Sequence, residues 1–411
     1  MNQVDIVAAA KRIKPVCVKT PLEQNAYLSG KFNCDIWLKR EDKQVVRSYK
    51  VRGAYNKICS LTNTELRKGV ICASAGNHAQ GVAFSCKLLQ VHCTVFMPAN
   101  TPKQKIERVK IKGGEFTELF LEGESYDDCL LAAIKFNQVA GKTFIPAFDD
   151  EKIIEGQGTV GMEITDQLEN IDYLILPVGG GGLAAGVGSW FKEHSPETIL
   201  IGVEPEGAAS MTLAFENGHP VSLEKMDPFV DGAAVQKAGI VTYPICKEVL
   251  HHLHTVPEGK VCATLLDMYN SEAIVAELAG CLSIAALDDF EDMIKGKKVV
   301  CILSGGNNDV LRIEEIKKIA DAYEGLHHHL MIRFKHQPDG LTDLFTKILG
   351  EHHYVTRLEY DRREHGRSTY GLVSIKSRSL RDYMSLLDRL EKHNVEFKEV
   401  KKEDFLFKYL V

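Results

Sequence analysis

Three short apolar runs, each leading directly into a loop that contains glycine, constrain the fold of this chain more than any other feature. The runs are residues 70–73, 173–178 and 298–303. Apolar runs of this length that alternate with helical segments are typical of strands buried on both faces of a parallel sheet. In such a sheet the loops after the strands meet at one edge, where ligands bind. The sequence therefore predicts an α/β region whose binding site is built from these loops.

Length, charge and cysteine usage exclude several classes of protein. The formal net charge of −6 leaves no basic surface of the kind that binds nucleic acid. No window approaches the roughly 18 consecutive apolar residues of a membrane-spanning helix, and residues 1–15 resemble a short amphipathic helix rather than a signal peptide. Eleven scattered cysteines without a Cys-x-x-Cys motif indicate buried thiols in a reducing compartment. We therefore expect a cytoplasmic protein that binds neither nucleic acid nor a membrane.

The pattern changes after about Tyr323, where charged, alternating segments replace the apolar runs. We expect strands at 330–334, 354–360, 370–375 and 395–400, and helices at 340–349 and 380–393. This βαββαβ order is that of the ferredoxin-like split unit. Because 411 residues also exceed one ordinary core, we expect two domains, residues 1–324 and 325–411.

His327, His328 and His329 stand just before the first strand of the second domain and suggest a metal site. Neighbouring side chains of a strand point to opposite faces, so three adjacent imidazoles cannot all converge on one ion. A structural or incidental role is therefore the favoured interpretation.

Lys50 is the first candidate for chemistry. It lies beside Tyr49 at the start of an expected helix, within residues 48–54 and shortly after residues 38–42. A lysine placed in this way can form a Schiff base with an aldehyde cofactor. A lysine taken alone is most often a solvated surface charge. The hypothesis of pyridoxal phosphate chemistry therefore depends on the glycine loops.

The loops offer groups that match such a cofactor. Residues 179–182 are four glycines between a strand and a helix, so their N–H groups can surround a phosphate without interference from side chains. The loop at 74–78 can present N–H donors to a carboxylate and the amide of Asn77 to a ring hydroxyl. Ser304 ends the third strand and can face a ring nitrogen. With Lys50, these residues would form one site at the carboxyl ends of the strands.

Two alternatives from other functional classes stay open at this point. The segment Gly180-x-Gly182-x-x-Ala185, with Glu204 at the end of the next strand, loosely fits the fingerprint of a dinucleotide-binding oxidoreductase. That reading leaves Lys50 unexplained. An amino-acid-sensing protein with an inactive catalytic site is the second alternative, and intact Lys50, Asn77 and Ser304 argue against it.

Residues 48–54, 74–81, 179–183 and 304–308 resemble the motifs of threonine dehydratase (threonine ammonia-lyase), a fold-type II pyridoxal phosphate family. The similarity spans nearly the whole chain and implies a tryptophan synthase β-like catalytic region of two α/β subdomains. It implies that Lys50 forms the Schiff base and that Tyr49, where the family usually has Phe, stacks on the cofactor ring. It also implies that Asn77 contacts the ring hydroxyl of the cofactor and that Ser304 contacts the ring nitrogen. The phosphate contacts that it implies are Gly179, Gly180, Gly181, Gly182 and Leu183. The substrate contacts are Ser74, Ala75, Gly76, Asn77 and His78.

The resemblance also implies an activity and partners. The activity is deamination of L-threonine to 2-oxobutanoate and ammonia, the first step of isoleucine biosynthesis. Residues 325–411 resemble a single ACT-like regulatory domain of the biosynthetic type, so we expect isoleucine and valine as effectors and a homotetramer. Serine dehydration and serine racemisation remain alternatives, because one methyl group in a pocket changes binding by only about 1–3 kcal/mol.

Glu204 and Ala208 resemble the monovalent or divalent cation site of some relatives. The alternative is an ordinary solvated carboxylate, and the sequence favours neither.

Overall fold

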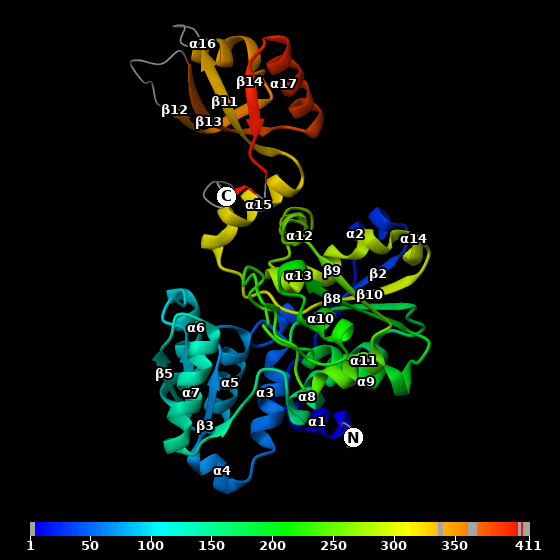
Figure 1. Ribbon diagram of the computed structural model, residues 1–411. Helices are drawn as coiled ribbons and strands as arrows, with labels where there is room; N and C mark the ends of the chain where they lie inside the picture. The colour runs from blue at the N-terminus through cyan, green and yellow to red at the C-terminus, as the bar shows by residue number, and fades with distance from the viewer. Residues whose placement is uncertain (1–4, 336–339, 361–367, 402–403, 406–411) are drawn as a thin grey trace. The chain divides into compact units, whose positions relative to one another are not determined.

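The computed structural model describes residues 5–335, 340–360, 368–401 and 404–405. The chain divides into two compact units, Met1–Asp309 and Val310–Val411 (Figure 1). Each unit is described by itself below.

The first unit contains a six-stranded sheet in the order β1-β2-β10-β7-β8-β9. All neighbouring strands are parallel except β1 and β2. The central strand β7 is buried along its whole length, as its continuous apolar sequence predicts. The bounds are β1 (Leu22–Gln24), β2 (Asp35–Arg40), β7 (Tyr173–Pro177), β8 (Ile199–Pro205), β9 (His252–Val256) and β10 (Lys298–Leu303).

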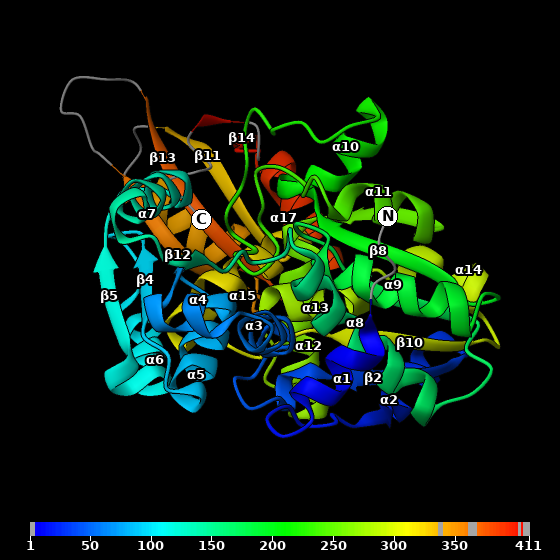
Figure 2. The same ribbon diagram turned by 90° about the horizontal axis from the view of Figure 1, so that it is seen from below.

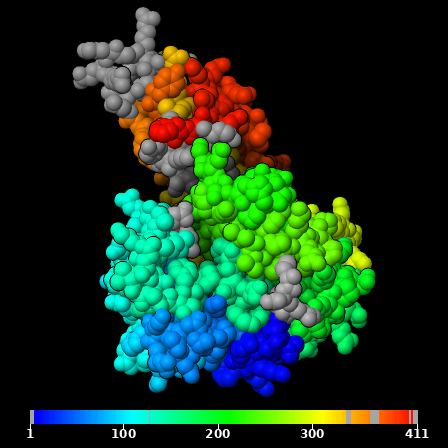
Figure 3. Space-filling view, turned by 60° about the horizontal axis from the view of Figure 1, so that its bottom comes forward, coloured from blue at the N-terminus to red at the C-terminus, as the bar shows by residue number. Residues whose placement is uncertain are grey.

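A second, four-stranded sheet in the order β5-β4-β3-β6 forms a smaller subdomain of the same unit. Its strands are all parallel: β3 (Val70–Ala73), β4 (Cys93–Met97), β5 (Thr117–Leu121) and β6 (Thr143–Phe144). Figures 1 and 2 show helix α3 (Lys50–Cys59) between the two sheets. In the space-filling view of Figure 3, the dark blue N-terminal segment lies at the surface beside residues of both subdomains.

Helices connect and cover the strands of both sheets. Besides α3 they are α1 (Ile6–Ile13), α2 (Ala26–Phe32), α4 (Asn63–Lys68), α5 (Asn77–Leu89), α6 (Lys103–Gly113), α7 (Tyr126–Ala140), α8 (Glu151–Gln167), α9 (Gly182–His194), α10 (Ser210–Asn217), α11 (Thr242–Val249), α12 (Glu258–Glu272), α13 (Leu278–Ala285) and α14 (Glu291–Ile294). Helices α8 and α9 approach closely because glycines face each other. A Cβ on Gly186 would come within 2.4 Å of the Ile154 carbonyl oxygen and 2.6 Å of the Gly158 nitrogen.

Buried charges hold the start of α3 in place. The Arg52 guanidinium donates to both oxygens of Glu41, at 2.7 and 2.9 Å, and to both oxygens of Glu163, at 2.7 and 2.9 Å. Lys39 on β2 donates to Glu163 at 2.7 Å. The side chains of Arg52 and Glu41 are fully buried. Charges removed from water need such partners, so this network ties the helix that carries Lys50 to β2 and α8.

The second unit begins with a 3₁₀ turn (Val310–Arg312) and α15 (Ile313–Tyr323) and continues as an antiparallel sheet with the strand order β12-β13-β11-β14. The strands are β11 (His327–Lys335), β12 (His353–Tyr360), β13 (Ser368–Ser377) and β14 (Glu396–Glu399). The helical segments are α16 (Gly340–Asp343), a π-helical turn at Leu344–Ile348 and α17 (Leu380–Lys392). The predicted βαββαβ order is therefore confirmed, and with it the ferredoxin-like architecture.

The unit boundary precedes the predicted position at residue 324. Helix α15 belongs with the second unit, because the Leu326 N–H donates to the Asp321 carbonyl oxygen and Lys376 pairs with Asp321. The change of composition after Tyr323 marks the first strand of this unit rather than its first helix.

The histidine triplet opens β11 and alternates between faces as predicted. The ring centroids of His327 and His329 lie 4.7 Å apart, whereas the His328 ring stacks on the Tyr383 ring with a centroid distance of 3.2 Å. Among the residues that the structure describes, no group of three His, Cys, Asp or Glu side chains is placed to hold a metal ion.

The eleven cysteines are all free thiols. In the described part of the chain no helix is both long and apolar enough to cross a membrane. The first four residues of the predicted N-terminal helix lie outside the described residues, and the helix itself spans Ile6–Ile13.

Candidate active site

The four sequence motifs meet at the carboxyl ends of strands in the first unit. Residues 74–76 connect β3 to α5, the glycine loop connects β7 to α9, and Ser304 follows β10. Backbone contacts join the lysine segment to the end of β10, since Ser48 pairs with Gly305 and the Tyr49 N–H donates to the Ser304 carbonyl oxygen at 3.2 Å. The tertiary structure therefore places Lys50 next to Ser304, although more than half of the sequence separates them.

Lys50 is the first residue of α3, and its amine lies close to two other groups. Its Nζ atom donates to the Ala147 carbonyl oxygen at 3.0 Å and lies 5.3 Å from the centroid of the Tyr49 ring. Burial lowers the pKa of Lys50 to about 8, and the nearby carboxyl of Glu277 opposes this shift. A lower pKa increases the fraction of neutral amine at neutral pH, which is the nucleophilic form.

The four glycines are required by packing as well as by backbone freedom. A Cβ on Gly180 would lie 2.4 Å from the Phe148 ring, and one on Gly181 would lie 2.5 Å from the Met211 methyl group. Gly181 also has a φ of 91°, in the left-handed region. It precedes α9 without a side-chain cap, so the first N–H groups of α9 remain available to an anion. Leu183 packs its side chain into the core, which leaves only its backbone for the loop.

The loop at 74–78 combines an open backbone with a buried side chain. A Cβ on Gly76 would meet no atom within 4 Å, so there is space in front of this residue. The Ser74 hydroxyl accepts from the Gly76 N–H at 3.2 Å. The His78 ring contacts the Ile145 carbonyl oxygen at 2.8 Å, and burial lowers its pKa to about 3. The neutral His78 ring is therefore committed to the core, and the backbone N–H is its remaining group for a ligand.

Glu277 is a residue of this site that sequence reasoning missed. Its carboxylate accepts from the Asn77 amide at 2.6 Å, and burial, together with the nearby charge of Asp231, raises its pKa to about 7. The Asn77 oxygen in turn accepts from Asn307 at 2.7 Å. The sequence held one indication of a buried functional carboxylate: Glu277 is the only charged residue in the largely apolar segment 273–287.

Ser304 is buried and its hydroxyl contacts the Ala279 carbonyl oxygen at a long 3.4 Å. The Ser48 hydroxyl nearby is also buried, and no partner is found for it among the described residues. Weakly engaged hydroxyls at the end of a strand are suited to a ligand that arrives there.

Glu204 lies one residue before the end of β8, and both of its carboxylate oxygens accept hydrogen bonds from protein groups. Its carboxylate accepts from the N–H groups of Met211 and Thr212 at 2.7 and 2.8 Å and from the Thr212 hydroxyl at 2.7 Å. Burial raises the pKa of Glu204 to about 7. Ala208 follows four residues later in a short 3₁₀ turn and is also buried. The observed role of Glu204 is to cap α10.

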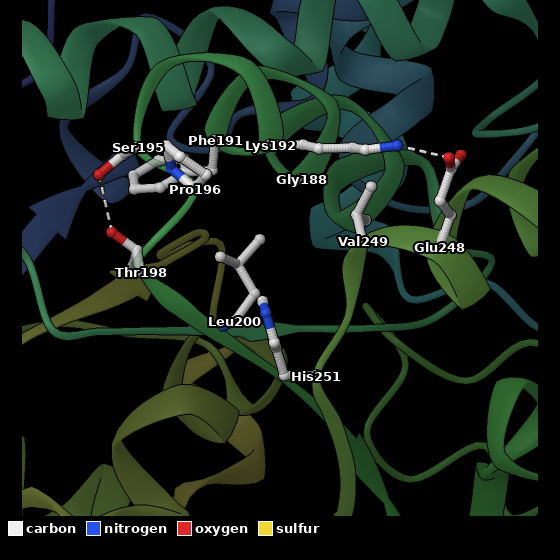
Figure 4. A pocket seen from close by; sticks show the side chains of 10 residues that line it. All are labelled: Gly188, Phe191, Lys192, Ser195, Pro196, Thr198, Leu200, Glu248, Val249 and His251. Atoms are coloured by element: carbon white, nitrogen blue, oxygen red, sulfur yellow. Dashed lines mark hydrogen bonds and ion pairs between the residues drawn. The ribbon is translucent and has the colours of Figure 1, made fainter.

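A surface pocket lies at the other end of the large sheet and takes no part in this site. Figure 4 shows its lining, which includes Lys192 and Glu248, paired at 2.5 Å, and Thr198 and Leu200 at the start of β8. The residues around Lys50 lie instead where the strands end.

The comparisons with known proteins agree with this geometry. A family model described as pyridoxal-phosphate dependent enzyme matches residues 13–305, which is more than half of the chain. The chain therefore belongs to the family of pyridoxal-phosphate dependent enzymes.

Within that family the chain is similar to biosynthetic threonine dehydratases. It is 47% identical over 408 residues to the biosynthetic L-threonine dehydratase IlvA of Halalkalibacterium halodurans, covering 99% of this chain and 98% of that protein. The biosynthetic L-threonine dehydratase IlvA of Bacillus subtilis is 44% identical over 407 residues, which cover 99% of this chain and 96% of that protein. The resemblance predicted from the four motifs is confirmed.

Solved structures support the same fold. The processed form of threonine deaminase isoform 2 from Solanum lycopersicum is 41% identical with a TM-score of 0.73, covering 77% of this chain and 92% of that chain. Maize serine racemase is 27% identical with a TM-score of 0.72, and the match covers 78% of this chain and 98% of that chain. The predicted fold class, a fold-type II catalytic region followed by a ferredoxin-like domain, is confirmed.

The residues of this structure fit pyridoxal phosphate. Lys50, whose pKa is lowered, donates to the Ala147 carbonyl oxygen, and the ring of the next residue, Phe148, packs against Gly180 of the glycine loop. Two weakly engaged hydroxyls, those of Ser48 and Ser304, lie next to the lysine segment. The loop and the start of α9 offer donors to a phosphate, and Lys50 offers a nucleophile to an aldehyde.

Proposed function

We propose that this chain catalyses the pyridoxal phosphate-dependent deamination of L-threonine to 2-oxobutanoate and ammonia, the first step of isoleucine biosynthesis. The observation that carries the proposal is the meeting of Lys50 and Ser304 at the end of β10, in a chain 47% identical to a biosynthetic threonine dehydratase. The bound cofactor would supply an electron sink that weakens the bonds at the substrate Cα.

Binding is assigned to backbone groups of two loops. The N–H groups of Gly179, Gly180, Gly181, Gly182 and Leu183 would hold the cofactor phosphate. In residues 74–78 the N–H groups of Ser74 and Gly76 bond to the Phe96 carbonyl oxygen and the Ser74 hydroxyl, so the remaining N–H groups would hold the substrate carboxylate and orient its Cα–H bond toward Lys50. Helix α3 is tied by the Arg52 network, so the Lys50 amine is held at a fixed place in the site.

Proton transfer at Cα is assigned to Lys50. A pKa of about 8 gives the Lys50 amine a useful neutral fraction near neutral pH, and its position next to the bound substrate makes the transfer effectively unimolecular. Ser304 would meet the ring nitrogen as a neutral hydroxyl, which does not force protonation of the ring as a carboxylate would. This favours prompt loss of the β-hydroxyl over transamination or racemisation.

Regulation and assembly are proposed from the resemblance to the biosynthetic type. We assign residues 325–411, with α15 before them, to a single ACT-like regulatory domain that responds to isoleucine and valine. A homotetramer in the cytoplasm is the proposed state. A monovalent or divalent cation at Glu204 and Ala208 would have to compete with the N–H donors of α10 for the same carboxylate.

One experiment tests the function directly. Purified protein loaded with pyridoxal phosphate is incubated separately with L-threonine and L-serine, and 2-oxo acid, ammonia and D-serine are measured. We expect 2-oxobutanoate from threonine at a higher kcat/KM than pyruvate from serine. D-Serine as the main product would instead assign the chain to serine racemases, such as its maize structural neighbour.

A further inference from the structure

A chain of side-chain hydrogen bonds crosses the site from α6 to the start of α13. Arg108 donates to the Asn307 oxygen at 3.1 Å, and the Asn307 amide nitrogen donates to the Val46 carbonyl oxygen at 2.8 Å and to the Asn77 oxygen at 2.7 Å. The Asn77 nitrogen then donates to Glu277 at 2.6 Å. Segments distant in sequence therefore contribute to one connected chain.

The chain fixes which way each amide faces. An arginine only donates and a backbone carbonyl only accepts, so the oxygen of Asn307 must face Arg108 and its nitrogen must face Val46. The same nitrogen reaches Asn77, which must therefore present its oxygen there and its nitrogen to Glu277. An amide nitrogen carries two hydrogens, so one N–H of Asn77 is left for a ligand.

Glu277 lies against the residue that follows Ser304. A Cβ on Gly305 would come within 2.2 Å of the Glu277 Oε1 atom, and the Glu277 N–H donates to the Gly305 carbonyl oxygen at 3.1 Å. Only 8% of Glu277 is exposed. A carboxyl oxygen accepts a hydrogen bond whether or not the group is charged, so the contact with Asn77 does not require ionisation.

We propose that Glu277 is a positioning residue that holds the Asn77 amide with one N–H directed at the ring hydroxyl of pyridoxal phosphate. Without the acceptor at Glu277, the Asn77 amide would lose the partner that holds its nitrogen side. The amide could then turn, so that its oxygen or a poorly directed N–H would face the ring hydroxyl. Either change weakens cofactor binding and changes the absorption of the bound cofactor. The inference rests on the proposed site assignment of Asn77 and deepens it.

The test uses the full-length protein without substrate, so that it does not depend on the reaction catalysed. Pyridoxal phosphate is titrated into apoprotein of the wild type, Glu277→Leu, Glu277→Gln, Asn77→Ala and the double variant Asn77→Ala/Glu277→Leu. Affinity is measured by protein fluorescence and the cofactor band by absorbance. Glu272→Ala is the matched control, because Glu272 also accepts from an asparagine amide, that of Asn25 at 2.7 Å, outside the site.

We expect Glu277→Leu to weaken cofactor binding about tenfold, which corresponds to about 1.4 kcal/mol, and to change the absorption band as Asn77→Ala does. The double variant should match Asn77→Ala alone, since Glu277 acts through Asn77. Glu277→Gln, which keeps an acceptor oxygen, and Glu272→Ala should stay within twofold of the wild type. If Glu277→Leu fails to fold, as judged by circular dichroism, Glu277→Met takes its place with the same expectations.

Two results would overturn the inference. One is a Glu277→Leu protein with the affinity and absorption of the wild type. The other is a double variant whose loss of affinity is the product of the two single losses, which would mean that Glu277 acts independently of Asn77. A wild type that binds the cofactor but does not deaminate threonine would refute the proposed function alone, because the spectra would still decide the role of Glu277.

Discussion

The buried network around Arg52 makes a strong prediction about stability. Replacing Arg52 by methionine, which is of similar length, removes four hydrogen bonds of 2.7–2.9 Å to Glu41 and Glu163. Lys39 still pairs with Glu163, but among the described residues the Glu41 carboxylate keeps only the hydrogen bond from the Thr20 hydroxyl, at 2.5 Å. Removing one partner of a buried pair costs about 3–5 kcal/mol, because the remaining charge stays in the interior without compensation. We expect a loss in this range at pH 7.

The loss should depend on pH with a defined sign. Burial raises the pKa of Glu163, but Arg52 and Lys39 together lower it below its ordinary value. A lowered pKa in the folded state stabilises the protein above the unfolded pKa of about 4.3 and loses this contribution as the pH falls through the folded value. Arg52→Met removes part of that contribution. The difference between wild type and variant should therefore stay constant from pH 7 down to about pH 5 and shrink as the pH falls below the unfolded pKa of about 4.3.

Urea denaturation followed by fluorescence at several pH values measures the effect. Lys192→Met is the control, because it breaks the exposed pair with Glu248, which contributes at most about 1 kcal/mol. Adding Glu41→Gln to Arg52→Met should recover part of the loss, since it removes the uncompensated carboxylate. An Arg52→Met protein as stable as the wild type, or a loss that does not change with pH, would refute this account of the network.

Other predictions concern the site and the second unit. Lys50→Ala should abolish threonine turnover but retain weak cofactor binding. The rate at which the wild type takes up cofactor should rise with pH through about 8, where the Lys50 amine becomes neutral. A borohydride adduct located by mass spectrometry on another lysine would contradict the assignment of Lys50. Ser304→Asp should bind cofactor but give more transaminated or racemised product per 2-oxobutanoate, and an unchanged product ratio in chromatography would remove Ser304 from control of the outcome. Gly180→Ala should reduce cofactor affinity more than tenfold, because its Cβ would lie 2.4 Å from the Phe148 ring, and titration of the apoprotein checks this. A chain ending at Asp309, the last residue of the first unit, should dehydrate threonine without inhibition by isoleucine, whereas inhibition equal to that of the full-length protein in saturation curves would place the effector site in the first unit.

The sequence alone determined the local parts of this protein. Continuous apolar runs such as β7 predict buried strands wherever they pack, and glycines after a strand predict loops that can approach a ligand. The βαββαβ order of the second unit follows from the spacing of its segments. These features depend on residues near one another in the chain, so local physical rules are sufficient to predict them.

The tertiary structure decided which distant residues meet and what each polar side chain contacts. Glu277 joins Asn77 from 200 residues away, and the Arg52 network joins Glu41 to Glu163. Glu204, for which a cation site and an ordinary solvated carboxylate were equally open from the sequence, is buried and caps α10, and the His78 ring is directed into the core. No local pattern encodes these contacts, because a buried polar group must take whichever partner the packing of separate elements brings within hydrogen-bond distance.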